Sequence, residues 1–296
     1  MKQIQWYPGH MAKTKKEVKE KIKLVDVVLE LLDARIPFSS QNPVIKELIG
    51  NKPRVILLNK ADLSDPIELD RWVSYFEEKG ATTLKINSLN GMGVDKIQGV
   101  LKIVLKDQRA KEISRGRKER AIRAMILGIP NVGKSTLINS LASKKKLIAQ
   151  DRPGVTKRTQ YIRVGQDFEL LDTPGILWPK FDSIDVALKL AITGAIKDNI
   201  LPVDDVVIFG FKYLYKNYLQ RFEDRYSIKV DIENIVEIYD NIGIKRGCLL
   251  PGKKIDYERV NDLFLYDFRH QKFGRITLDK VSNYVWFWTW FTEQRS

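Results

Sequence analysis

The sequence is poor in cysteine, in long apolar runs and in acidic residues. Its single cysteine, Cys248, excludes an intramolecular disulfide and a zinc site built from four cysteines, and is typical of a reducing compartment. Residues 1–17 contain no apolar stretch of a secretory signal. The apolar run at 284–291 is far shorter than the roughly 20 residues of a membrane helix. We therefore expect a cytoplasmic protein without stable membrane association.

The charge balance of the 296-residue chain indicates polyanionic partners. Lysine and arginine total 51 and the acids 37, which gives a formal net charge of +14. Such an excess concerns partners rather than the fold, and it favours nucleic acid or an anionic membrane surface. Hydrophobic residues make up 44% and charged residues 30%, as in a folded globular protein. The length predicts about two domains.

The first two-thirds of the sequence alternate between short apolar runs and helical stretches, which predicts an α/β fold with a parallel sheet. The expected strands cover residues 25–33, 54–59, 83–87, 124–128 and 169–172. The expected helices cover residues 42–50, 67–79, 94–110 and 135–142. Beyond Pro179 we find only segments of helical period, at 183–197, 206–222, 232–241, 257–271 and 278–292. We expect an α/β domain over 1–178 and an all-helical domain over 179–296, with most aromatic residues of 284–291 in the helical core.

Residues 128–135 read GIPNVGKS and match the phosphate-loop pattern G-x-x-x-x-G-K-[ST]. The motif follows an expected strand and opens an expected helix, so that successive backbone N–H groups form an anion nest at a helix N-terminus. Lys134 is expected to reach the β- and γ-phosphates and Ser135 to ligate Mg²⁺. The residues expected to contact the nucleotide here are Asn131, Val132, Gly133, Lys134, Ser135 and Thr136.

A second motif, DTPG at 172–175, follows the expected strand at 169–172. In phosphate-loop proteins an aspartate at a strand end reaches Mg²⁺, directly or through water, so Asp172 is expected to do so. Gly175 is expected to let a backbone N–H approach the γ-phosphate. An ordinary strand-to-turn D-x-x-G is the alternative, and the presence of the phosphate loop upstream favours the nucleotide.

A third motif, NKAD at 59–62, predicts that the base is guanine. A carboxylate at Asp62 accepts from guanine N1–H and the 2-amino group together, whereas adenine offers neither donor there. Asn59 is expected to organise the loop and Lys60 to lie over the base, while Asn87 and Ser88 add backbone contacts to the guanine oxygen. A capped turn is the alternative interpretation of this segment.

The guanine motif lies upstream of the phosphate loop, which reverses the order found in an ordinary GTPase. Both loops are nevertheless expected at the carboxyl edge of one parallel sheet, where α/β folds bind ligands. The same sheet forms if the chain is cut elsewhere and its original ends are joined. The sequence therefore predicts a circularly permuted GTPase domain.

These motifs resemble those of the circularly permuted ribosome-assembly GTPases. The resemblance is carried by WYPGHM at 6–11, LDARIP at 32–37, NKAD at 59–62, GIPNVGKST at 128–136, RPGVTK at 152–157 and DTPGI at 172–176. It implies a Ras-like GTPase fold, hydrolysis of GTP to GDP, and Mg²⁺ as the metal. It also implies a role in late assembly of the large (50S) ribosomal subunit, with binding to its precursor through rRNA and activation by that particle. We expect a monomer.

The position that holds a water-orienting glutamine in Ras-like enzymes is Ile176, whose aliphatic side chain cannot polarise water. The resemblance implies two alternative replacements, which stay open here. His10 would position the water, or Asn131 would help hold K⁺ near the phosphates, where positive charge stabilises the transition state. The resemblance also favours Thr156 over Thr159 as the switch threonine on Mg²⁺.

Basic residues gather in separate clusters, each of which by itself more often forms a solvated face than a binding site. The clusters lie at 13–23, 109–123, 144–146 and 245–275, the last mixed with tyrosine and phenylalanine. Within the first, Val18, Ile22 and Val25 form an apolar stripe of helical period. Together the clusters favour RNA as partner, with binding that weakens as salt rises. A metabolite phosphotransferase and a membrane-surface signalling GTPase are the competing interpretations.

Overall fold

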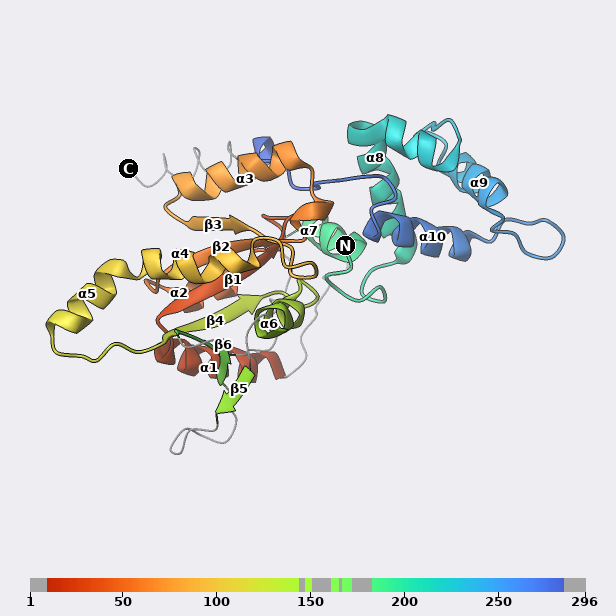
Figure 1. The fold of residues 1–296 in the computed structure, drawn as a ribbon. Coiled ribbons are helices and arrows are strands. Elements are labelled where there is room, and N and C mark those ends of the chain that lie inside the picture. Colours follow the sequence, from red (N-terminus) through yellow and green to blue (C-terminus); the bar gives the residue numbers. More distant parts are fainter. Residues whose placement is uncertain (1–9, 144–146, 151–160, 165–166, 172–182, 285–296) are drawn as a thin grey trace. The chain divides into compact units, whose positions relative to one another are not determined.

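The computed structural model describes residues 10–143, 147–150, 161–164, 167–171 and 183–284. The chain forms two compact units (Figure 1). The first comprises Met1–Phe181 together with Asp279–Ser296, and the second comprises Asp182–Leu278.

The first unit is built on a sheet in which seven strands are described, in the order β3-β2-β1-β4-β7-β6-β5. The strands are β1 (Val27–Asp33), β2 (Arg54–Asn59), β3 (Thr82–Lys85), β4 (Ile122–Gly128), β5 (Leu147–Gln150), β6 (Tyr161–Val164) and β7 (Phe168–Leu171). β3, β2, β1, β4 and β7 pair in parallel, in this order across the sheet. β6 pairs with β7 and β5 in antiparallel fashion. The five expected strands are therefore confirmed, whereas β5 and β6 were not expected.

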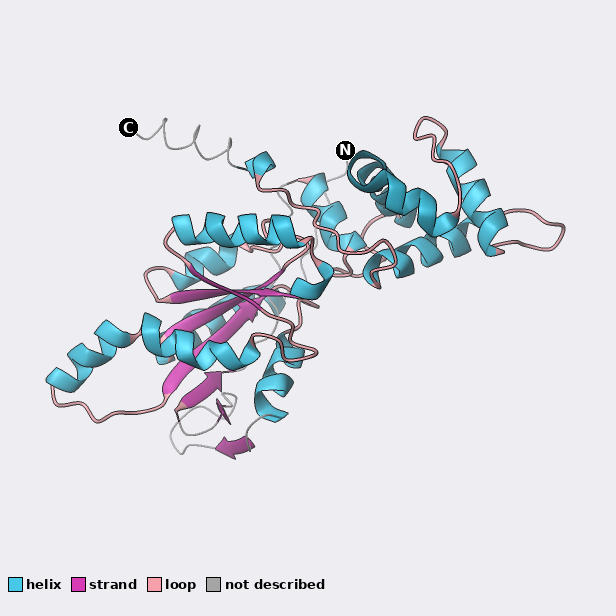
Figure 2. Ribbon diagram, turned by 45° about the horizontal axis from the view of Figure 1, so that its top comes forward, coloured by secondary structure: helices cyan, strands magenta, loops and turns pink. Residues whose placement is uncertain are grey.

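Helices connect the parallel strands and cover the sheet (Figure 2). They are α1 (His10–Lys21), η1 (Ile22–Leu24), α2 (Pro43–Ile49), η2 (Ala61–Leu63), α3 (Pro66–Glu78), η3 (Val94–Lys96), α4 (Ile97–Val104), α5 (Lys106–Ser114) and α6 (Lys134–Ser143). Asn42 and Asp65 cap α2 and α3, since each side chain accepts a hydrogen bond from a backbone N–H of the first turn, and a proline follows each cap. The expected mixed α/β architecture is confirmed.

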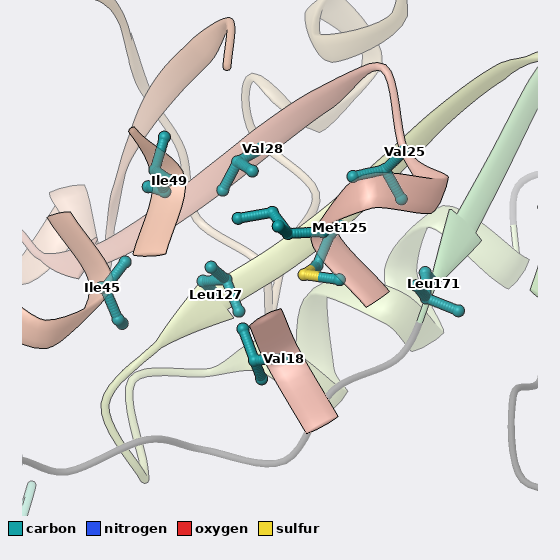
Figure 3. Packing of buried hydrophobic residues seen from close by; sticks show 9 residues of the cluster. Val18, Val25, Val28, Ile45, Ile49, Met125, Leu127 and Leu171 are labelled. Carbon is teal, nitrogen blue, oxygen red and sulfur yellow. The ribbon is translucent and has the colours of Figure 1, made fainter. Parts of the chain in front are cut away.

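The apolar stripe of α1 and η1 faces the sheet. Val18 is fully buried and packs with Val28 of β1, Met125 of β4 and Ile45 of α2 in one hydrophobic cluster (Figure 3). Lys16, by contrast, is exposed on the same helix. The predicted amphipathic helix is confirmed, and its apolar face is structural.

Helices are the regular elements in the described residues of the second unit, which also contain one isolated bridge between Leu249 and Ile255. Its helices are α7 (Ile184–Ile192), α8 (Val203–Tyr226), α9 (Ile235–Arg246) and α10 (Tyr257–Arg269). Phe211, Phe222 and Phe264 are completely buried and form its centre, with the rings of Phe211 and Phe264 4.8 Å apart and nearly perpendicular. The expected all-helical domain is confirmed.

The segment after α10 returns to the first unit, whereas all of 179–296 was expected in the second. The Asp279 carboxylate accepts from the backbone N–H of Ser39 at 2.6 Å and from its hydroxyl at 2.9 Å. The Asp279 carbonyl accepts from the indole N–H of Trp72 at 2.7 Å, and Tyr284 stacks on Phe38 at 4.1 Å. The expectation that Tyr284 belongs to the helical core is therefore wrong, because its partners lie on the sheet unit.

Candidate functional site

The candidate site lies at the carboxyl ends of the central parallel strands. Asp33 ends β1 and pairs in register with Asn59, which ends β2. On the other side of β1, Leu31 pairs with Gly128, which ends β4 and begins the phosphate loop. Two motifs that are distant in sequence thus start on either side of β1 at the carboxyl end of one sheet, where α/β folds bind ligands.

The Asn59 side chain joins three loops. Its amide nitrogen donates to the Val132 carbonyl of the phosphate loop at 2.7 Å, and its amide oxygen accepts from the Ser88 N–H at 2.9 Å and the Ser88 hydroxyl at 2.8 Å. Asn59 and Ser88 are both buried. The structure therefore brings the segments expected to bind base and phosphate into contact, as the permuted arrangement requires.

The phosphate loop has the backbone geometry that its glycines permit. Asn131 has a φ of +54° and Gly133 a φ of +105°. A Cβ added at Gly133 would lie 2.4 Å from the Asn59 amide nitrogen, so only glycine fits at this close approach. The Lys134 ammonium donates to the carbonyls of Gly128 at 3.1 Å and Ile129 at 2.7 Å, which holds it against the loop.

The residues that follow Lys134 stand on the first turn of α6. Ser135 and Thr136 are exposed there, and Val132 is buried below the loop. The Ser135 hydroxyl fits Mg²⁺, because this ion prefers oxygen ligands. Among the described residues, no cluster of three histidine, cysteine, aspartate or glutamate side chains is arranged to hold a metal.

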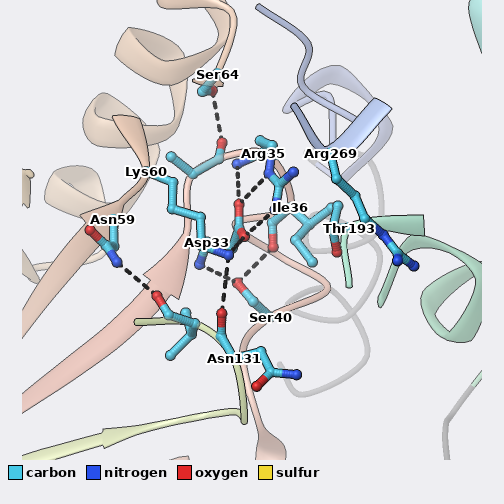
Figure 4. A network of polar contacts seen from close by, with 12 residues as sticks. Asp33, Arg35, Ile36, Ser40, Asn59, Lys60, Ser64, Asn131, Thr193 and Arg269 are labelled. Carbon is cyan, nitrogen blue, oxygen red and sulfur yellow. Dashed lines mark hydrogen bonds and ion pairs between the residues drawn. The ribbon is translucent and has the colours of Figure 1, made fainter. Parts of the chain in front are cut away.

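Lys60 connects the guanine motif to the phosphate loop by a second route (Figure 4). Its backbone is left-handed, with a φ of +58°. Its ammonium lies 3.1 Å from the Asn131 carbonyl and 2.9 Å from Oδ2 of Asp33. No role was expected of Asp33, although its place at the end of the apolar run 25–33 is a sequence signal that points to this edge.

The Asp33 carboxylate is buried and ionised. Arg35 donates to it through Nε at 3.0 Å and Nη2 at 2.8 Å. Burial opposes ionisation, but the positive charges and hydrogen bonds of Arg35 and Lys60 outweigh it and hold the pKa of Asp33 well below its usual range.

The loop after β3 is shaped by internal hydrogen bonds. The Asn87 N–H donates to the Met92 carbonyl at 2.9 Å, and the Asn87 side chain accepts from the Leu89 N–H at 2.8 Å. The Ser88 N–H, expected to reach the guanine oxygen, donates to Asn59 instead. Asp62, the expected reader of the guanine edge, lies half-buried in η2.

Four expected site residues lie outside what the structure describes. These are Thr156, Asp172 and Gly175, together with the side chain of His10. β7 ends at Leu171, directly before Asp172. The roles assigned to these four residues stay predictions.

None of the helices in the described part of the chain is long and apolar enough to cross a membrane.

Comparisons with known proteins agree with this geometry. A family profile described as "50S ribosome-binding GTPase" matches residues 123–235. Ribosome biogenesis GTPase A of Bacillus pumilus is 50% identical over 277 residues, covering 94% of this chain and 98% of the relative. The solved structures of YlqF from T. maritima include a GNP-bound form, 26% identical with a TM-score of 0.62, which covers 90% of this chain and 98% of that one. The GDP-bound form is 27% identical with a TM-score of 0.63, and covers 89% and 98%.

The guanine motif precedes the phosphate loop in the sequence, and both lie at the carboxyl end of one sheet. The first unit is therefore a circularly permuted phosphate-loop GTPase. Its nucleotide is a guanine nucleotide, and its reaction is GTP hydrolysis. The chain belongs to the ribosome biogenesis GTPase A family.

Proposed function

We propose that this GTPase is an assembly factor for the large (50S) ribosomal subunit, which binds the precursor through rRNA and is activated by it. Nucleotide binding by this site is supported by the contacts of the Asn59 side chain, which joins the base loop to the phosphate loop. The names of its relatives support the ribosomal part, and the formal charge of +14 supports an RNA partner.

In this proposal the described loops bind GTP and the remaining motif residues complete the site. Asp62 accepts from the guanine edge, and Lys134 neutralises charge on the β- and γ-phosphates. Ser135, Thr156 and Asp172 hold Mg²⁺, which when bound neutralises charge on the phosphate oxygens. The Gly175 N–H contacts the γ-phosphate.

The missing glutamine leaves slow hydrolysis in the free protein, and the ribosomal particle accelerates it. His10 orients the attacking water, or K⁺ held near Asn131 supplies the charge. His10→Ala separates these alternatives, since it should lower turnover on particles while sparing GTP affinity. Turnover that depends on K⁺ and ignores the His10 substitution would assign the role to the cation.

The structure divides the basic clusters into structural and exposed parts. In the 109–123 cluster, Arg120 is paired with Asp26 at 2.6 Å and Arg123 with Glu169 at 3.1 Å, so these charges serve the fold. In the second unit, the turn between α9 and α10 leaves Lys253 exposed, and an exposed tyrosine, Tyr257, follows it. Exposed cations beside exposed aromatic rings suit RNA, because phosphates and unpaired bases are contacted together.

A gradient-sedimentation experiment tests the ribosomal role. The protein is mixed with 50S precursor particles in GDP, in a non-hydrolysable GTP analogue, or without nucleotide, and its GTP turnover is measured with and without particles. We expect co-sedimentation that depends on the nucleotide, is weakened by salt, and is accompanied by faster hydrolysis. Lys134→Ala should abolish the nucleotide dependence, and equal turnover with and without particles would contradict the proposal.

Two charge-reversal variants test the RNA contact. Lys253→Glu with Lys254→Glu should weaken particle binding several-fold and lower its salt dependence, because each phosphate contact contributes to that dependence. Lys79→Glu with Lys96→Glu is the matched control, since both lysines are exposed and lie outside the basic clusters. Equal losses in the two variants would indicate nonspecific attraction. Preferential binding to anionic lipid vesicles would favour the membrane alternative instead.

A further inference from the structure

Asp33 lies at the carboxyl end of β1, beside the residues of the candidate nucleotide site. It ends β1 in register with Asn59, and 1% of its surface is exposed. Its backbone N–H donates to the Ser40 hydroxyl at 3.1 Å, and the same hydroxyl donates to the Ile36 carbonyl at 2.7 Å. The backbone around the carboxylate is therefore fixed by hydrogen bonds within the loop that follows β1.

The Asp33 carboxylate faces two cations with different tasks. Oδ1 accepts from the backbone N–H and the Nε of Arg35, both at 3.0 Å, and Oδ2 accepts from Arg35 Nη2 at 2.8 Å. Arg35 is itself buried, so this bidentate pair is part of the packed loop. Oδ2 also lies 2.9 Å from the Lys60 ammonium, which is the contact toward the guanine motif. A fully hydrogen-bonded buried carboxylate of this kind offers a fixed anchor for the lysine.

Lys60 is the bridge between the two nucleotide loops. Its ammonium contacts Asp33 on one side and the Asn131 carbonyl of the phosphate loop at 3.1 Å on the other. Its side chain retains 25% exposure, so the stem remains accessible to a base. A lysine stem has many rotamers, and ordering it before the nucleotide arrives removes that entropic cost from binding.

We propose that Asp33 is a positioning residue for guanine-nucleotide binding, which fixes the Lys60 ammonium against the Asn131 carbonyl and thereby pre-orders the base and phosphate loops. The proposal rests on the assignment of residues 59–62 to guanine recognition. Asp33 acts through Lys60 and touches no part of the nucleotide itself.

A double-mutant cycle on the full-length protein tests this relation. The variants are Asp33→Asn, Lys60→Met and the two combined, and the measurement is the Kd of a fluorescent GDP. Lys60→Met keeps an apolar stem and removes the charge, and should weaken GDP binding tenfold or more. Asp33→Asn should weaken it about tenfold when residue 60 is lysine and less than twofold in the Lys60→Met background. Coupling of this kind identifies residues that act through one contact.

Two further variants separate positioning from stability. Asp26, which directly precedes β1 at the end of the strand opposite Asp33, is a matched control, because it is 7% exposed and accepts two hydrogen bonds from Arg120, at 2.6 and 2.8 Å. Asp26→Asn should lower the melting temperature and leave the GDP Kd within twofold. If Asp33→Asn alone fails to fold because Arg35 is left unpaired, Asp33→Asn with Arg35→Gln removes both charges and takes its place in the cycle.

The outcomes are distinguishable. Wild-type GDP affinity in Lys60→Met would refute the assignment of residues 59–62, and with it the proposal. Weakened affinity in Lys60→Met, together with an Asp33→Asn loss of equal size in both backgrounds, would refute the positioning role alone. A loss in Asp26→Asn as large as that in Asp33→Asn would show that the effect comes from stability.

Discussion

Gly133→Ala tests the contact between the two nucleotide loops most directly. A Cβ at this position would lie 2.4 Å from the Asn59 amide nitrogen, and the φ of +105° is one that residues with a side chain rarely adopt. The backbone strain costs roughly 1–3 kcal/mol. Displacing Asn59 also disturbs its bonds to Val132 and Ser88, which contribute roughly 1 kcal/mol each. Because the variant must recover about 3–5 kcal/mol to adopt the binding geometry, we expect the GDP Kd to rise by two orders of magnitude or more.

Titration with a fluorescent GDP measures this effect, and urea unfolding without nucleotide measures stability. Gly80→Ala is the matched control, because Gly80 also has a positive φ, of +75°, but an added Cβ meets nothing within 4 Å. It should cost roughly 1–2 kcal/mol of stability and leave the GDP Kd unchanged. If Gly133→Ala bound GDP as the wild type does, the close approach of the loops would not be needed for binding, and the reasoning from Asn59 would fail.

Three further outcomes are expected. Because folding lowers the pKa of Asp33 from its ordinary value of 3.8, its ionisation stabilises the protein fully above about that pH and progressively less below it. The free energy of unfolding of Asp33→Asn should therefore fall less between pH 5 and pH 3 than that of the wild type. Urea unfolding at pH 5, 4 and 3 measures this. Trp72→Phe leaves the buried carbonyl of Asp279 without its indole donor and should lower the free energy of unfolding by roughly 1–3 kcal/mol; an unchanged urea midpoint would contradict this. Gly210→Ala places a Cβ 2.5 Å from the ring of Phe264, so overpacking should exceed the gain in helix propensity and destabilise the second unit by roughly 1 kcal/mol in thermal unfolding.

Much of the first unit follows from local sequence signals. Apolar runs predict the five strands that pair in parallel, and the segment 67–79 predicts α3, which spans Pro66–Glu78 behind an aspartate cap. β5 and β6, which read LIAQ and YIRV, were missed, and they pair in antiparallel fashion outside the strand–helix alternation that marks the five expected strands. The single helix expected over 94–110 is divided at Leu105, where the backbone leaves helical geometry with a ψ of 4°. Short strands and helix breaks depend on tertiary contacts more than on local pattern.

The site is predictable where a motif specifies its own chemistry, and less so where residues meet through the fold. The phosphate loop and the guanine motif are each complete within a few residues, so their convergence follows from strand ends alone. The contact of Asp33 with Lys60 depends on the register of β1 and β2, which no spacing in the sequence reveals. The bond from Trp72 to Asp279 likewise joins residues separated by most of the chain, and helical periodicity near Leu278 gave the opposite expectation.

The return of the chain at Asp279 makes the helical unit an insertion with two covalent attachments. A stop codon placed after residue 278 would therefore keep every helix from α7 to α10 but remove part of the first unit, including the Asp279 acceptor of Trp72 and Ser39 and the Tyr284 ring that stacks on Phe38. Isolating the nucleotide-binding part would therefore call for an internal deletion of Asp182–Leu278 rather than a truncation of the chain. The helical unit, by contrast, is one uninterrupted stretch of sequence.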